Sequence, residues 1–186
     1  MIPHIHTCMD LMERYHMLGH IRLHSIVVAK VSHLIARCLR ESGFDISIEK
    51  VTAGALLHDI GKTISLGTGD DHARIGRDIC MENHLHEIAE IVDQHVILKG
   101  YSIDSDYSEK EIVYYSDKRV NHDKIVSLKE RESYILERYG GNASGLRKRI
   151  RENFTLCRKI EDKLFVRLDF DPGILSTIAV KEDIGL

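Results

Sequence analysis

An adjacent histidine and aspartate stand at the end of an apolar run in the segment LLHDIGK, residues 56–62. Imidazole nitrogens and carboxylate oxygens are common protein ligands of divalent transition metals. Two neighbouring residues cannot hold a metal alone, so a metal site would need ligands from other parts of the chain. The sequence contains 12 histidines, most of them before residue 100. Histidine is the commonest metal ligand and an acid–base group near neutral pH, which makes this part of the chain the place to look.

Apolar residues recur every three or four positions in several segments, which predicts helices with one face turned inward. Three of these segments carry a histidine on that inward face, and a fourth carries an aspartate. The segments are 20–42 with His24, 47–59 with His58, 85–98 with His95, and 109–120 with Asp117. A buried imidazole or carboxylate is costly unless it is paired. Several such groups that converge are best explained by a shared cation, which would satisfy them together.

Helix-capping residues and glycines predict where the helices in the middle of the chain begin and end. Ser47 is expected to cap the helix over 47–59, and Gly61 to end it. The segment SLGTGDD, residues 65–71, is rich in glycine and aspartate and is expected to be a loop. A short helix over 72–83 should follow, with His72 at its start.

The C-terminal third has a different character. Two charged amphipathic helices are predicted, over 127–139 and 142–165, with Ser127 and Glu130 forming a capping box at the start of the first. The basic run LRKRIR, residues 146–151, is typical of a solvated helix face rather than of a nucleic-acid contact. The last stretch, from residue 166, loses the helical period and is expected to be an irregular tail. Its apolar part, ILSTIAV, needs cover, which could come from a second copy of the chain.

The order of the ligand-type residues resembles a known signature. His24, the pair His58-Asp59 and Asp117 are similar to the H…HD…D pattern of the HD-domain metal-dependent phosphohydrolases, and HDIGK matches the HDIG subgroup. The likeness covers roughly residues 20–125. It implies an all-α fold in which residues 1–125 form an HD-type helical core. Residues 126–186 would then be a helical extension and tail packed on the same domain.

The resemblance implies a metal site. His24, His58, Asp59 and Asp117 would ligate one divalent ion, and two imidazoles with two carboxylates suit Fe, Mn, Co, Ni, Mg or Zn. Asp123 is the alternative to Asp117 as the fourth metal ligand. Asp117 is preferred because it follows the apolar helical stretch EIVYY.

Further roles follow from the same resemblance. Lys62 corresponds to a lysine often found beside the substrate phosphate, and Lys118 is a second candidate for phosphate contact. His72 and His95 occupy places where two-metal members carry extra histidines. Many of those members have a double histidine where this chain has His95 followed by Val96, and the G-Y-P element of one phosphodiesterase branch is absent. A second metal therefore stays open, with phosphate contact or proton transfer as the alternative roles of His72 and His95.

Such a site predicts hydrolysis of a phosphomonoester or phosphodiester, in a nucleotide or a small phosphorylated metabolite. A bound divalent cation lowers the pKa of water from about 16 toward about 7, which yields a hydroxide nucleophile at neutral pH. Asp59 and Lys62 are the candidate catalytic residues. Two alternatives remain: a non-catalytic metal-containing binding or signalling module, and a di-iron oxygenase, which would need both His72 and His95 as ligands.

Composition narrows the class of protein. Hydrophobic residues make up 43% and charged residues 30% of the 186 positions, which is typical of a globular protein with its own core. The net charge of -3 argues against a general affinity for nucleic acid or anionic membranes. No run of about 18 apolar residues and no secretory signal is found. The four cysteines are scattered without a C-x-x-C pair, so we expect free thiols in a cytoplasmic protein.

Overall fold

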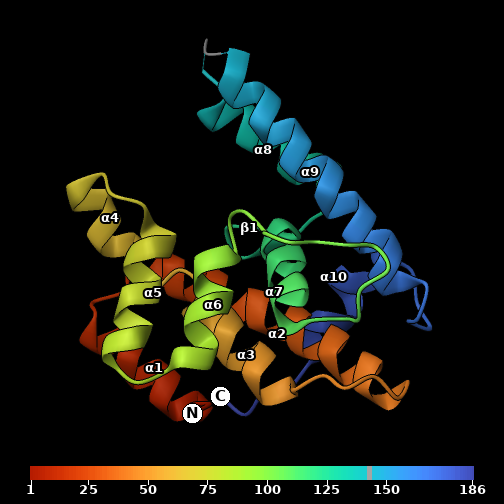
Figure 1. Ribbon diagram of the computed structural model, residues 1–186, viewed down its shortest axis with the longest axis horizontal. Helices are drawn as coiled ribbons and strands as arrows, with labels where there is room; N and C mark the ends of the chain where they lie inside the picture. The colour runs from red at the N-terminus through yellow and green to blue at the C-terminus, as the bar shows by residue number, and fades with distance from the viewer. Residues whose placement is uncertain (142–143) are drawn as a thin grey trace.

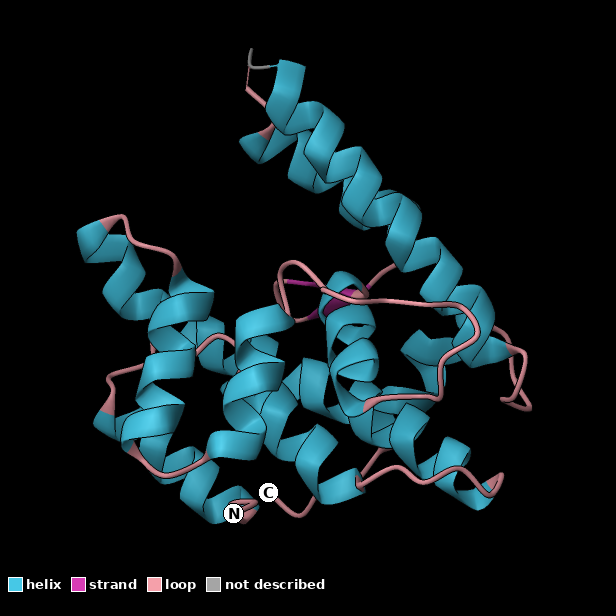
Figure 2. Ribbon diagram, viewed as in Figure 1, coloured by secondary structure: helices cyan, strands magenta, loops and turns pink. Residues whose placement is uncertain are grey.

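The computed structural model describes residues 1–141 and 144–186, and helices dominate it (Figures 1 and 2). The helices are α1 (Ile5–Arg14), α2 (Gly19–Glu41), α3 (Ile48–Leu57), α4 (Lys62–Thr68), α5 (His72–Glu82), α6 (His86–Gln94), α7 (Glu109–Lys118), α8 (Leu128–Tyr139), α9 (Ser144–Phe165) and α10 (Leu175–Ile178), with 3-10 turns η1 (Pro172–Ile174) and η2 (Ala179–Lys181). A small antiparallel hairpin joins β1 (Val120–Asn121) to β2 (Lys124–Ile125). The predicted all-α class is confirmed. Across the described residues, every helix is too short or too polar to cross a membrane.

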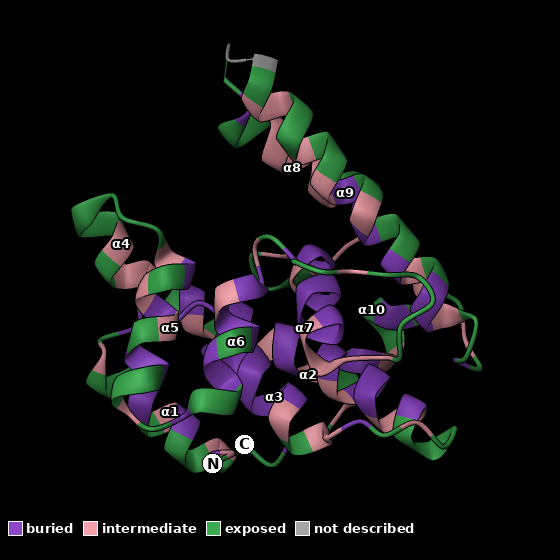
Figure 3. Ribbon diagram, viewed as in Figure 1, coloured by how far each residue is buried: buried purple, intermediate pink, exposed green. Residues whose placement is uncertain are grey.

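Helix α2 lies at the centre of the core. It packs against α3 and α7, and α3 also contacts α1 and α6. Figure 3 shows that α3 and α7 consist largely of buried residues. Val28 and Ile35 of α2 and the rings of Tyr114 and Tyr115 of α7 are fully buried. Removing one side chain of this size from water contributes about 1.5–3 kcal/mol, so the core holds these helices in fixed relative positions.

The start of α3 is as predicted, but its end is not. The Ser47 hydroxyl accepts a hydrogen bond from the Lys50 amide at 3.1 Å and caps the helix. The helix ends at Leu57 and not at Gly61, whose φ of -78° is ordinary. The role of Gly61 is steric instead. A Cβ at this position would lie 2.4 Å from the His72 carbonyl oxygen. The missing side chain therefore lets α5 pass close to the turn that follows α3.

The loop predicted over residues 65–71 is wrong for residues 65–68. They belong to α4, and only 69–71 connect it to α5. Gly69, with a φ of +80°, ends α4 in the left-handed conformation that glycine adopts without strain. Because α4 has no buried residue, it shows no inward apolar stripe from which the sequence could predict it.

Helices α8 and α9 form a charged hairpin. Ser127 and Glu130 make the predicted capping box. The second predicted helix would begin at residue 142, but residues 142 and 143 lie outside the described part, and α9 is described from Ser144. The C-terminal part of α9 packs near α7, whereas α8 and the start of α9 extend away from the core (Figure 1).

The tail is more ordered than predicted. It contains η1, α10 and η2, which contact α2 and β2. Leu175, Ala179 and Ile184 are buried within the chain, and Glu182 forms an ion pair with Arg37 at 3.0 Å. The core thus supplies cover for part of the apolar tail, and assembly with a second copy stays a prediction.

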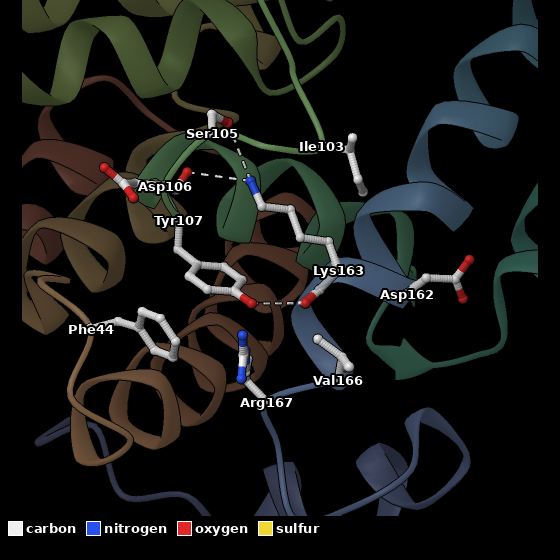
Figure 4. Close-up of a pocket in the computed structure, with 9 residues that line it drawn as sticks. All are labelled: Phe44, Ile103, Ser105, Asp106, Tyr107, Asp162, Lys163, Val166 and Arg167. Carbon is white, nitrogen blue, oxygen red and sulfur yellow. Dashed lines mark hydrogen bonds between the residues drawn. The ribbon is translucent and has the colours of Figure 1, made fainter.

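A surface pocket of about 440 Å³ lies where the loop before α7 meets α9 (Figure 4). Beside it, the buried Lys163 ammonium contacts both carboxylate oxygens of Glu111, at 3.1 and 3.2 Å. The same ammonium donates to Ser105 Oγ and to the Asp106 carbonyl oxygen, each at 3.3 Å, and the Tyr107 hydroxyl donates to the Lys163 carbonyl. Because these hydrogen bonds tie the loop to α9, we interpret this cluster as structural.

Candidate metal centre

Ligand-type side chains from five helical segments converge at one end of the core. They are His24 in α2, His58 and Asp59 at the end of α3, His72 at the first position of α5, His95 directly after α6, and Asp117 in α7. Each was selected from the sequence. The structure brings all of them together, although their roles as ligands stay predictions.

The first group joins His24, His58 and Asp59, each of which offers one ligand atom within 4.8 Å of the others. Asp117 lies beside this group: its Oδ1 is 3.0 Å from His24 Nε2 and 3.7 Å from His58 Nε2. Asp123, the rival of Asp117, is exposed in the turn between β1 and β2. The predicted set of two imidazoles and two carboxylates can therefore surround a single ion.

A second group joins Asp59, His72 and His95, again within 4.8 Å. Asp59 Oδ1 lies 3.4 Å from His72 Nε2 and 3.5 Å from His95 Nε2. The two Nε2 atoms are 3.1 Å apart. Asp59 belongs to both groups, so its two oxygens could contact two ions.

Backbone carbonyls orient three of the imidazoles. His58 Nδ1 donates to the Ala55 carbonyl, and His95 Nδ1 to the Val92 carbonyl, both at 2.6 Å. His24 Nδ1 donates to the His122 carbonyl at 2.8 Å. A proton on Nδ1 leaves the lone pair on Nε2, which faces the centre of the cluster in each case. Such outer hydrogen bonds fix the ring orientation of metal-binding histidines.

Sequence reasoning missed His122. It lies at the tip of the β1–β2 turn with a φ of +56°. Its backbone carbonyl, not its side chain, accepts the hydrogen bond from His24. Any residue type offers that carbonyl, so residue type gave no signal. Its ring lies edge-on to Tyr134 of α8, with centroids 5.3 Å apart.

Two helix ends add to the field at the site. His58 is the C-cap of α3 and His95 the C-cap of α6. The C-terminal end of a helix carries a partial negative charge and stabilises cations nearby. Both ends therefore favour a positive ion at the position that the side chains surround.

Two buried atoms test whether a cation fits. His58 Nε2 and Asp59 Oδ1 are inaccessible to solvent and have no hydrogen-bond partner. Leaving a buried polar atom unpaired costs about 1–3 kcal/mol, more for a charged group. Both atoms face the groups defined above, so a bound divalent ion would satisfy them. The donor set fits the implied metal.

Two lysines flank the carboxylates. Lys62 Nζ lies 2.7 Å from Asp59 Oδ2, and its side chain is 38% exposed. Lys118 is buried, with Nζ 3.1 Å from Asp117 Oδ2, in contact with the His95 carbonyl and 4.3 Å from the centroid of the Tyr114 ring. Of the two, Lys62 is the one open to an entering phosphate.

Neighbouring charges lower the pKa values of two carboxyls in the cluster, and burial lowers those of two imidazoles. Burial disfavours ionisation of Asp59, but His58 and Lys62 outweigh it and hold the pKa of that carboxyl well below its usual range. Lys118 and His24 have the same effect on the pKa of Asp117 against its burial. Burial lowers the pKa of His95, and burial together with His95 lowers the pKa of His72 to about 4. The carboxylates are thus charged and these two imidazoles neutral at pH 7, the forms in which they bind metals.

A model of the HD-domain family matches residues 22–138, which include His24, His58, Asp59, His72, His95 and Asp117. The chain belongs to the HD-domain family. HD domains form a superfamily of metal-dependent phosphohydrolases, which agrees with the convergence of histidine and aspartate side chains. The finer assignment to the HDIG subgroup stays a prediction from the motif.

Three curated relatives resemble this HD-domain chain. A tRNA (cytidine(56)-2'-O)-methyltransferase of Thermoplasma volcanium is 34% identical over 110 residues, which are 59% of this chain and 30% of that protein. An uncharacterized protein of Methanocaldococcus jannaschii is 27% identical over 138 residues, 67% of this chain and 80% of its own. A second tRNA (cytidine(56)-2'-O)-methyltransferase, of Picrophilus torridus, is 29% identical over 145 residues, 69% of this chain and 40% of its own. The chain thus spans less than half of either methyltransferase. No solved structure matches the chain.

Proposed function

We propose that the chain is a metal-dependent phosphohydrolase that cleaves a phosphomonoester or phosphodiester of a nucleotide or a small phosphorylated metabolite. The observation that carries this proposal is the cluster around Asp59, in which His58 Nε2 and Asp59 Oδ1 are buried without a hydrogen-bond partner. Family membership gives the general reaction class. The bond and the substrate are the proposal.

The chain's own residues have distinct tasks in this proposal. His24, His58, Asp59 and Asp117 would hold the first divalent ion. A bound divalent cation supplies Lewis acidity and a water of lowered pKa. The Lys62 ammonium, partly exposed beside Asp59, would bind a non-bridging phosphate oxygen and offset the charge that develops there.

His72 and His95 fit a second ion better than proton transfer. An efficient general acid has a pKa near the working pH, whereas the pKa of His72 is about 4. At pH 7 such an imidazole is neutral and lacks the acidic second ring proton that an imidazolium would give to a leaving alkoxide. A neutral imidazole 3.4 Å from Asp59 Oδ1 instead offers a lone pair to a cation. The proposal therefore includes a second ion between Asp59, His72 and His95.

The substrates to be tested follow from the site and from the relatives. Two relatives are named as enzymes that modify tRNA. Their shared segment is a minor part of each, so methyl transfer does not carry over to this chain. The name nevertheless supports including RNA with a terminal phosphate beside nucleotides and sugar phosphates.

The test is a panel of phosphate esters, assayed with the purified chain after dialysis against Mn, Ni, Co or Mg. We expect metal-dependent release of phosphate, abolished by Asp59→Asn, and a raised KM in Lys62→Met. Activity in Asp59→Asn equal to that of the unaltered chain would contradict the site. A chain that binds less than about a tenth of an equivalent of each metal and cleaves none of the panel would contradict the function.

A di-iron oxygenase is the second candidate. It is favoured by one observation, the proximity of Asp59, His72 and His95 to the first group. Oxygen consumption by the iron-loaded chain, with a di-iron spectroscopic signature, would support it. We expect hydrolysis without oxygen uptake.

A further inference from the structure

The hairpin of α8 and α9 forms a positively charged arm, which we define as residues 128–141 and 145–151. It contains seven basic and three acidic residues, a net charge of +4, whereas the whole chain carries -3. The arm extends away from the core, and exposed residues prevail on it (Figures 1 and 3). Charge of one sign that is gathered on a projecting element creates a local field opposite to that of the rest of the molecule.

The base of the arm adjoins the candidate metal centre. Tyr134 of α8 contacts the His122 ring, and the His122 carbonyl accepts the hydrogen bond of His24. Arg131 Nη1 lies 2.8 Å from Asn121 Oδ1 in the same turn. One face of α8 is therefore turned toward the elements that hold the site.

Basic and aromatic side chains alternate along that face. Arg131, Tyr134 and Arg138 are three and four positions apart, which places them on one side of a helix. A rise of about 1.5 Å per residue puts Arg131 and Arg138 roughly 10 Å apart along the axis. The Arg138 guanidinium lies 5.8 Å from the centroid of the Tyr139 ring, and Tyr139 is 54% exposed. The stripe thus leads outward from the site and ends on an exposed aromatic ring.

Within the part of the chain that the structure describes, ion pairs between the arm and its neighbours in α9 leave several of the arm's basic side chains without an acidic partner. Among the described residues, Lys148 pairs with Glu152 at 3.8 Å and Arg158 with Glu132 at 2.8 Å. Arg138 and Arg149 are exposed, and neither has an ion pair within the described ranges. Their guanidinium groups are available to an anionic partner.

Positive charge interleaved with aromatic rings is the pattern by which proteins bind single-stranded nucleic acid, where the cations follow the phosphates and the rings stack on bases. An acidic peptide would satisfy the charges but would leave the rings unused. A chain of phosphate esters also offers a terminal phosphate, which is the group that the neighbouring site is proposed to cleave.

We propose that the arm binds the backbone of a single-stranded oligonucleotide whose terminal phosphate enters the metal centre. This inference rests on the proposed function for the substrate's reacting end, whereas the binding surface rests on the arm. The proposed ligand is a short strand that binds only at the arm. The net negative charge of the whole chain still disfavours general binding to nucleic acid.

The test measures binding of a fluorescein-labelled strand of about ten nucleotides, as RNA and as DNA, to the metal-loaded chain by fluorescence anisotropy. We expect the logarithm of the binding constant to fall linearly with the logarithm of salt concentration. The double variant Arg138→Glu and Arg149→Glu should weaken binding at least about tenfold and reduce that slope by about 1.4, since each phosphate contact to a single strand contributes roughly 0.7.

Tyr139→Leu separates nucleic acid from a generic polyanion. Loss of one stacking contact should weaken binding about tenfold without changing the salt slope, because stacking is not ionic. Inorganic polyphosphate should bind equally to this variant and to the unaltered chain. The control is Arg40→Glu with Lys181→Glu, two exposed positions outside the arm, and it should leave oligonucleotide binding unchanged.

The outcomes distinguish the two proposals. No binding at low salt, binding indifferent to the arm variants, or an equal loss in the control would overturn the arm as the binding surface. If the chain hydrolyses an aryl phosphate but the arm variants bind as the unaltered chain does, the function stands and this inference fails. If the arm binds the strand but no phosphate ester is cleaved, the surface stands and the proposed function fails.

Discussion

The Nε2 atoms of His72 and His95 lie 3.1 Å apart, and both are within 3.5 Å of Asp59 Oδ1. Two imidazoles this close cannot both be positively charged without strong repulsion, and burial adds to that cost. Two neutral imidazoles beside a carboxylate are the donors of a borderline divalent metal. Whether this histidine pair binds an ion therefore decides whether the site holds one ion or two.

We predict two equivalents of Mn or Co for the unaltered chain, and one for His72→Asn and for His95→Asn. Loss of a ligand should weaken the second ion more than the roughly 10–100-fold expected for an outer-shell change. Elemental analysis after equilibrium dialysis measures the stoichiometry. His86→Asn, at an exposed histidine, is the matched control and should keep two equivalents. A single equivalent in the unaltered chain would show that this pair holds no ion.

Asp117 and Asp123 give a second, paired prediction. Asp117 Oδ1 faces His24 Nε2 at 3.0 Å, whereas Asp123 is exposed in the hairpin turn. Asp117→Asn keeps the shape of the side chain and removes the charge. We expect it to lower metal affinity and kcat/KM by about a hundredfold or more, as removal of an electrostatic contact to the reacting centre does. Asp123→Asn should change neither quantity, and equal losses in both variants would refute the assignment of Asp117.

Much of this site was predictable because its residues lie on helices or directly after their ends. His24 lies on an apolar stripe that continues after it, and Asp117 follows the stretch EIVYY, so helical periodicity alone turns both inward. His58-Asp59 stands out as a polar pair after an apolar run. Local pattern suffices where the backbone between the residues is one continuous helix.

Contacts between elements were not predictable in the same way. The meeting of His72 with His95 depends on how α5 packs against α6, and the distance from His72 to Asp59 depends on how closely α5 approaches the turn after α3; no local pattern encodes either. The His122 carbonyl leaves no signal in residue type. Helix α4 carries no buried residue, so its sequence resembles that of a loop. The first two features arise from tertiary packing, which overrides propensity in short segments.

The close approach at Gly61 makes a third prediction. A Cβ at this position would meet backbone atoms of α5, 2.4 Å from the His72 carbonyl oxygen and 2.6 Å from the Gly76 nitrogen. Backbone atoms cannot swing aside as a side chain can, so Gly61→Ala must push α5 away. We expect a loss of about 1–3 kcal/mol in the free energy of unfolding, as for other overpacked positions, and weaker binding of the second ion because His72 moves with α5.

Gly67→Ala is the matched control for Gly61. Gly67 lies within α4, and nothing is within 4 Å of its Cβ position. Alanine in a helix interior is favoured over glycine by about 0.5–1 kcal/mol, so this variant should be slightly more stable. Urea unfolding measures both variants. Equal midpoints for Gly61→Ala and the unaltered chain would mean that α5 does not press on Gly61.

His33, away from the metal centre, makes the fourth prediction, on pH. Its Nδ1 lies 3.0 Å from Thr52 Oγ1, whose hydroxyl donates to the Ile48 carbonyl. Burial lowers the pKa of His33, although Glu182, 3.7 Å from Nε2, acts in the opposite direction. Below about pH 6.5 the unfolded chain therefore takes up a proton at this residue before the folded chain does. Stability contributed by neutral His33 is present above that pH and is lost as the pH falls.

His33→Gln should flatten this dependence, since its amide can donate to Thr52 but does not titrate. We expect the urea midpoint to fall less between pH 7.5 and pH 5.5 in His33→Gln than in the unaltered chain. A chelator keeps metal release out of the comparison. His20→Gln, at an exposed histidine, should retain the pH response of the unaltered chain. A response in His33→Gln as steep as that of His20→Gln would mean that the cost of protonating His33 in the fold is negligible.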